Sequence, residues 1–142
     1  MKRITIGIAS ALAMLAFAAT SSAGIRIDAI SFDSPGADTG SNSSLNAEWI
    51  RLKNTGSTAR KLTGWTVRDT SGHVYKFGTY KLGAGKTVKI HTGKGSNTAR
   101  DRYWRSDEYI WNNDGDRAKL KNKAGSVIDT CAYSGAGSSV SC

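Results

Sequence analysis

The sequence predicts an all-β protein built as a β-sandwich of short antiparallel strands. Short segments with period-two alternation recur along the chain, and turns rich in Gly, Asn and Ser separate them. No window after residue 23 carries the apolar period of an amphipathic helix. The 142 residues suffice for one domain with a hydrophobic core, and we find no internal repeat.

The segment 46–69 predicts two strands around a polar turn. Ile50 and Leu52 alternate with basic residues, which is the pattern of a strand with one buried face. Turn residues at 54–57 interrupt the alternation. Three residues then resume an apolar face: Leu62, Trp65 and Val67.

The rest of the chain predicts further strands joined by loops. The other predicted strands are 24–32 with a bulge near 28–29, 74–77, 87–91, 116–122 and 127–133. Residues 33–45 predict a long loop, and one helical turn is expected around 99–104. The run 112–115 predicts a hairpin turn. Residues 134–142 predict a flexible Gly/Ser-rich tail.

The first 23 residues predict a secretory signal peptide. Lys2 and Arg3 precede an apolar run over 4–19, and small residues at 21–23 match a signal-peptidase site. The alternative is a retained membrane anchor, but the run is short for a spanning helix. We therefore expect cleavage after Ala23, secretion from the cell and no transmembrane segment in the mature chain.

The expected mature chain is basic. Removing Lys2 and Arg3 from the 20 basic residues leaves 18 against 11 acidic residues, a net charge of +7. Outside the cell, such a charge favours anionic partners such as cell-wall polyanions, acidic polysaccharide, DNA or lipid surfaces. The alternative is that the charge only maintains solubility.

Cys131 and Cys142 are the two cysteines of the chain. An even count in a secreted protein predicts one intramolecular disulfide, which would tie the tail 134–142 back to the last predicted strand. The alternatives are a free Cys142 or a bridge between molecules.

Three motifs carry a likeness to a known family. The first comprises Asn46, Glu48, Trp49, Ile50, Leu52 and Asn54. The second comprises Leu62, Gly64, Trp65 and Asp69. The third comprises Trp111, Asn112, Asn113, Asp114, Gly115 and Asp116, followed by Leu120. In this order the motifs resemble the lamin tail domain (LTD) family, an immunoglobulin-like β-sandwich that also occurs in secreted bacterial proteins.

The resemblance covers nearly all of residues 24–133. Gly125, Asp129 and Tyr133 fit the closing hairpin and last strand of the family, whereas Ala84 stands where the family often has proline. The resemblance implies an immunoglobulin-like fold and a binding or scaffolding role, and it brings no catalytic residues.

Several short patterns imitate reactive sites without completing them. Residues 83–87 lack the first glycine and the helix of a phosphate-binding loop, and residues 112–116 lack the ligands of a calcium loop. His73 and His91 lack further ligands for zinc. Glu48 is expected to be a buried structural carboxylate, because a catalytic acid normally needs a second carboxylate. We expect no metal and no cofactor.

Two basic segments are candidates for binding. Arg117, Lys119, Lys121 and Lys123 recur every second residue, so an extended strand would place them on one face. This row is either an ordinary solvated face, such as a protected edge, or a track for a polyanion. The second segment interleaves aromatic and basic residues: Arg100, Arg102, Trp104 and Arg105. Trp104 either stacks on a ligand or anchors the segment to the core.

Together these observations predict a secreted, non-enzymatic, monomeric binding or scaffolding module. Its partner would be an anionic polymer or an envelope protein, and any binding of nucleic acid would be non-specific. The alternative function is that of a small secreted hydrolase such as a nuclease.

Cleavage after Ala23 predicts a secreted product that begins at Gly24. The intact mass of the protein recovered from culture medium checks this expectation. A mass that retains the first 23 residues would support the anchor alternative instead.

Overall fold

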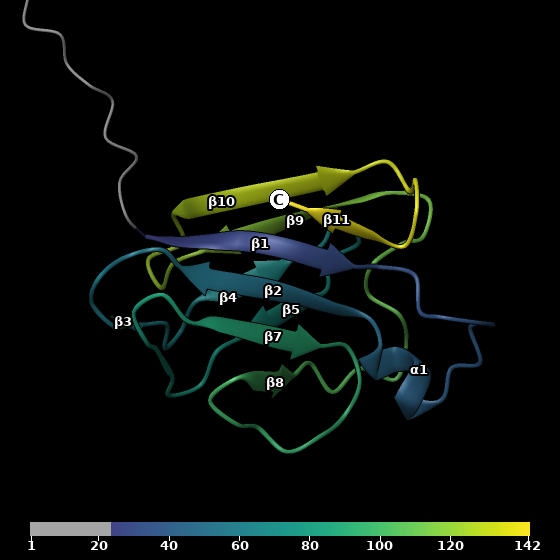
Figure 1. Ribbon diagram of the computed structural model, residues 1–142, viewed down its shortest axis with the longest axis horizontal. Coiled ribbons are helices and arrows are strands. Elements are labelled where there is room, and N and C mark those ends of the chain that lie inside the picture. The colour runs from purple at the N-terminus through teal and green to yellow at the C-terminus, as the bar shows by residue number, and fades with distance from the viewer. Residues whose placement is uncertain (1–23) are drawn as a thin grey trace, which may run out of the picture.

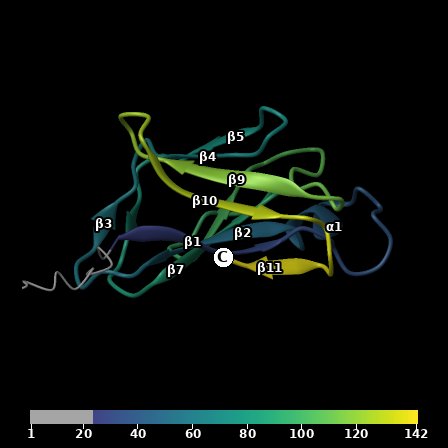
Figure 2. The same cartoon turned by 90° about the horizontal axis from the view of Figure 1, so that it is seen from above.

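The computed structural model describes residues 24–142, so the predicted signal peptide lies outside the described residues. Two β-sheets pack face to face, as Figures 1 and 2 show. The first sheet has five strands in the spatial order β11-β1-β2-β7-β8. Their bounds are Ile25–Ser31 for β1, Trp49–Asn54 for β2, Thr87–His91 for β7, Asp101–Tyr103 for β8 and Ser139–Ser141 for β11.

The second sheet has four strands in the order β10-β9-β4-β5. Their bounds are Thr66–Arg68 for β4, Val74–Lys76 for β5, Asp116–Lys121 for β9 and Val127–Tyr133 for β10. A short pair, β3 (Arg60–Lys61) and β6 (Lys81–Leu82), forms a separate two-stranded sheet. The pairs are antiparallel except β7–β8, which is parallel. The predicted immunoglobulin-like sandwich is confirmed.

The core lies between the two large sheets and follows the predicted alternation. In β2 the buried positions fall on Ile50, Leu52 and Asn54, with half-buried residues between them. The predicted bulge in β1 is present as a register shift between Ile27 and Ala29. The largest fully buried side chains include Phe32, Phe77, Ile90, Ile110, Trp111 and Leu120.

The second strand predicted for the segment 46–69 is in fact two short strands in different sheets. Trp65 N–H donates to the Leu62 carbonyl oxygen at 2.9 Å, and Gly64 sits at φ +81°. This turn ends β3 and sends the chain across the sandwich into β4. The positive φ explains why glycine occupies position 64, because only glycine adopts it without steric cost.

Three local predictions are wrong, one because of a local helix cap and two because distant segments pair. The loop 33–45 runs into a one-turn helix, α1 (Asn42–Asn46), whose N-cap Ser41 side chain accepts from Ser44 N–H at 3.2 Å. The helical turn expected around 99–104 is strand β8, because Lys89 N–H donates to Arg100 and Trp104 N–H donates to His91. The C-terminal tail forms β11 on the edge of β1.

The hairpin predicted at 112–115 is only a turn. Gly115 N–H reaches the Asn112 carbonyl at 3.4 Å and β9 follows, but residues 104–115 form no strand that could pair with it. The reason is that the N–H groups of Ile110 and Trp111 donate to a buried carboxylate instead of a neighbouring strand.

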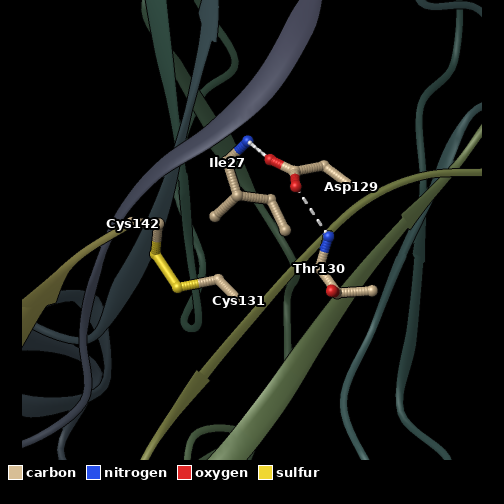
Figure 3. Close-up of a disulfide and its surroundings, with 5 residues drawn as sticks. All are labelled: Ile27, Asp129, Thr130, Cys131 and Cys142. Atoms are coloured by element: carbon tan, nitrogen blue, oxygen red, sulfur yellow. Dashed lines mark hydrogen bonds between the residues drawn. A yellow bond between two sulfur atoms is a disulfide. The ribbon is translucent and has the colours of Figure 1, made fainter.

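One open edge of the sandwich, between β1 and β10, is closed by a covalent bond and a carboxylate (Figure 3). The predicted Cys131–Cys142 disulfide is present and joins β10 to the residue after β11. Asp129 reaches from β10 to the edge of β1, where it accepts Ile27 N–H at 2.8 Å. Cys142 N–H also donates to the Asp28 carbonyl at 2.9 Å. These contacts hold the C-terminal residues in place.

We predict that replacing both cysteines by alanine lowers the free energy of unfolding by about 3 kcal/mol at most, because the bridge closes a short loop. The sandwich should still unfold cooperatively, since β11 contributes only Val140 to the packing around the core. Urea denaturation of the double variant and the wild type measures the difference. A variant without a cooperative transition would contradict this prediction.

Candidate functional site

The outer surface of the four-stranded sheet carries five cations that point away from the core. They come from three neighbouring strands, and we call them the basic face: Arg68 in β4, Lys76 in β5, and Arg117, Lys119 and Lys121 in β9. Arg68 lies directly opposite Lys119 in the β4–β9 register.

The basic face contains no carboxylate. The acidic residues of β9 and β10, Asp116 and Asp129, point inward and accept hydrogen bonds. Within residues 24–142, none of the five cations forms an ion pair. Their charge is therefore available to an external anion.

The structure corrects the predicted basic row in two respects. Strand β9 ends at Lys121, so Lys123 lies in the following turn, and its side chain packs beside Gly64. The row in β9 has three cations, and Arg68 and Lys76 extend it sideways. In addition, β9 lies between β10 and β4, so the row is not a protected edge.

The second predicted segment, 100–105, does not form one binding surface. Trp104 is half-buried and packs against Trp111 at 6.1 Å and Tyr75 at 5.8 Å between ring centres. Trp104 therefore anchors the segment to the core, which is the second of the two alternatives for this residue. Arg102 lies over the Tyr80 ring at 4.6 Å, and Arg105 donates to the Gly95 carbonyl at 3.0 Å. Of the four candidate residues in this segment, Arg100 is exposed and has no side-chain contact of this kind. It lines a hollow together with Lys81 and Lys86.

Trp49 lies on the outer surface of the five-stranded sheet, as its alternation with Arg51 indicates. Two cations cover its ring: Lys89 at 4.2 Å and Arg51 at 5.4 Å from the ring centre. Arg51 also donates to Asp28 at 2.7 Å. The ring is thus already occupied by cation–π contacts rather than open for stacking. Lys89 belongs to another strand, so only the β2–β7 register brings it there.

Glu48 is fully buried and joins three separate parts of the chain. Its Oε1 accepts Thr92 Oγ1–H at 2.7 Å, Ile110 N–H at 2.7 Å and Trp111 N–H at 3.0 Å. Its Oε2 has no partner among the described residues. Burial raises the pKa of Glu48 to about 7, although its hydrogen bonds favour the charged form. The structural role expected for Glu48 fits this position.

Two other polar residues of the motifs also bind the backbone internally. Asn54 donates to the carbonyls of Thr58 and Leu82 at 2.9 and 3.0 Å. Asp116 accepts the Thr70 N–H and hydroxyl at 3.2 and 2.8 Å. These two side chains close loops, so Asn54 and Asp116 hold the fold.

The two histidines are engaged in hydrogen bonds. His73 Nδ1 lies 2.5 Å from Asp69 and its Nε2 lies 2.9 Å from Glu108, and the contact with Asp69 is the main reason that the pKa of His73 is raised. His91, on the outer surface as expected, contacts the Asn46 carbonyl and Asp101, both at 2.8 Å. In residues 24–142, no group of three or more His, Cys, Asp or Glu is arranged to hold a metal ion.

Comparison with known protein families identifies the family to which the chain belongs. The model of the Lamin Tail Domain family matches residues 18–135, and the chain belongs to that family. It is a family of non-catalytic immunoglobulin-like domains, consistent with a binding module. A comparison with curated proteins finds no match. Within residues 24–142, no helix is long and apolar enough to cross a membrane.

The raised pKa of Glu48 predicts a pH-dependent stability. Between its ordinary pKa of 4.5 and about 7, the folded state keeps the proton that the unfolded state releases. Stability from this group is therefore complete below pH 4.5 and lost as the pH rises to 7, by about 3 kcal/mol. Glu48→Gln retains an acceptor for the three donors but cannot titrate.

Urea denaturation of both proteins across pH 4–8 measures this effect. The wild type should lose more stability than Glu48→Gln over the interval from 4.5 to 7. Parallel pH profiles for the two proteins would contradict the assignment.

Proposed function

We propose that this chain is a secreted, non-enzymatic binding module that contacts linear anionic polymers through the basic face. The carrying observation is the arrangement of five cations on three neighbouring strands, with no carboxylate on that surface. A surface that only maintained solubility would be expected to mix charges of both signs.

The spacing of the basic face suits an extended polyanion. Along β9 the three cations follow each other at about 6.6 Å, and neighbouring strands add cations at about 4.8 Å sideways. The sheet presents the cations on rigid strands, so little side-chain order is lost on binding beyond the lysine and arginine tips. Contacts of this kind neutralise phosphates, sulfates or carboxylates without reading a sequence.

Secretion is supported by two independent features. The disulfide is compatible with an oxidising compartment outside the cytosol. The basic and apolar pattern of residues 1–23 has the composition of a signal peptide. A secreted basic module would meet anionic cell-wall polymer or extracellular DNA before any intracellular polyanion.

We predict that Lys119→Glu with Lys121→Glu abolishes retention on heparin and DNA resins at moderate salt. Both side chains lie on the outer surface, so the variant should remain folded. For the wild type, three to four neutralised phosphates give a slope of log affinity for DNA against log salt of about −2.7 to −3.6.

A matched control carries the same change in net charge away from the basic face. Lys53→Glu with Arg60→Glu places the substitutions in β2 and β3 and should lower retention much less. Equal retention of the folded β9 variant and the wild type would overturn the basic face as the binding surface. Metal-dependent cleavage of the DNA that persists through repurification would overturn the non-enzymatic assignment in favour of a nuclease.

A further inference from the structure

A second group of cations surrounds a hollow at the point where the β3–β6 pair meets the starts of β7 and β8. The hollow has a volume of about 490 Å³, and an adjoining one of about 420 Å³ shares Lys81 and Ala99 with it. We call this region the lysine groove and define it by four residues: Lys61, Lys81, Lys86 and Arg100.

The charges of the lysine groove are not neutralised by the protein. Lys61 and Lys81 lie directly opposite each other in the β3–β6 register, an arrangement that is unfavourable in the absence of an anion. Within the described residues none of the four cations forms an ion pair. The carboxylate nearest in sequence, that of Asp101, contacts His91 Nε2 at 2.8 Å instead.

The backbone around the lysine groove is held in place before any ligand arrives. Tyr80 donates its hydroxyl to the Ala99 carbonyl at 2.6 Å, and Lys89 N–H donates to the Arg100 carbonyl at 2.9 Å. On the opposite side, Asn54 N–H donates to the Lys86 carbonyl at 2.9 Å. The backbone that carries these cations is therefore ordered before binding, which lowers the entropic cost of binding, although the exposed side chains must still be ordered.

We propose that the lysine groove binds a compact, multiply charged phosphate group. Lys81, Lys86 and Arg100 line one hollow and together match a ligand with two or three negative charges. Arginine and lysine are the side chains that recognise phosphate, by paired hydrogen bonds and by point charge respectively. Lys86 belongs to the 83–87 segment that imitates a phosphate-binding loop, but its neighbours across the hollow, not a helix, complete the site.

This site goes beyond the polymer-binding function. The basic face belongs to β4, β5 and β9, whereas the lysine groove is built from β3, β6, the turn before β7 and the residue before β8. Either surface can fail its test without affecting the other. The linear polymer and the compact phosphate are also different ligands in shape.

Titration of the ¹⁵N-labelled protein, residues 24–142, with inorganic pyrophosphate at low salt tests the proposal. Saturable shifts are expected at the amides of Gly83, Gly85 and Arg100, with a dissociation constant below about 1 mM. Lys86→Gln with Arg100→Gln should weaken binding at least about tenfold, because it removes two charge-assisted contacts. The matched control, Lys119→Gln with Lys121→Gln, removes two charges from the basic face and should leave the affinity within about twofold of the wild type.

Sulfate and inorganic polyphosphate complete the comparison. Weaker binding of sulfate than of pyrophosphate at the same ionic strength supports a phosphate site. Equal shifts with sulfate and pyrophosphate would indicate general anion screening and would overturn the proposal. Polyphosphate that shifts the amides of the lysine groove more than pyrophosphate does identifies a polymer as the source of the phosphate. Shifts confined to β9, or equal weakening by both double variants, would overturn the site.

Discussion

The structure depends on the buried carboxylate of Glu48. One oxygen of this side chain accepts hydrogen bonds from Thr92, which follows β7, and from Ile110 and Trp111, which precede the third motif. Burying a carboxylate is unfavourable, and three donors on one oxygen offset only part of that cost, since burial still raises the pKa of Glu48 to about 7. Without Glu48, two backbone N–H groups in the core would lose their partner, and the segment that carries Trp104 and Trp111 would lose its attachment.

The same principle extends to three other polar residues of the motifs. Asn54, Asp69 and Asp116 are all buried, and each binds backbone groups of a loop. These buried side chains therefore hold loops in place by hydrogen bonds to the backbone, and none of the three is exposed to solvent. The two candidate binding surfaces, the basic face and the lysine groove, contain none of these three residues.

The sequence predicts those features that depend on local pattern alone. Period-two alternation correctly identifies β2, β7, β9 and the core position of Trp65, and the pattern around 28–29 correctly predicts the bulge in β1. Strands β8 and β11 were not predictable in this way, because they consist of short polar segments that pair only through tertiary hydrogen bonds. The spacing of the basic residues in β9 likewise predicts that three of them share one face. Arg68 and Lys76 join this face only through the pairing of β4 with β9 and β5. Lys81 and Arg100 are distant in sequence, and only the fold brings them to the same hollow.

The internal use of carboxylates also shapes the surface charge. Glu48, Asp69 and Asp116 are buried, and Asp28 is paired with Arg51, so part of the acidic residues is withdrawn from the surface. The basic residues, by contrast, remain outside because their charge is costly to bury. Nine of the basic residues lie on the basic face and in the lysine groove. A requirement of the fold, that loops be closed by buried carboxylates, thus produces the electrostatic field on which binding of anions would depend.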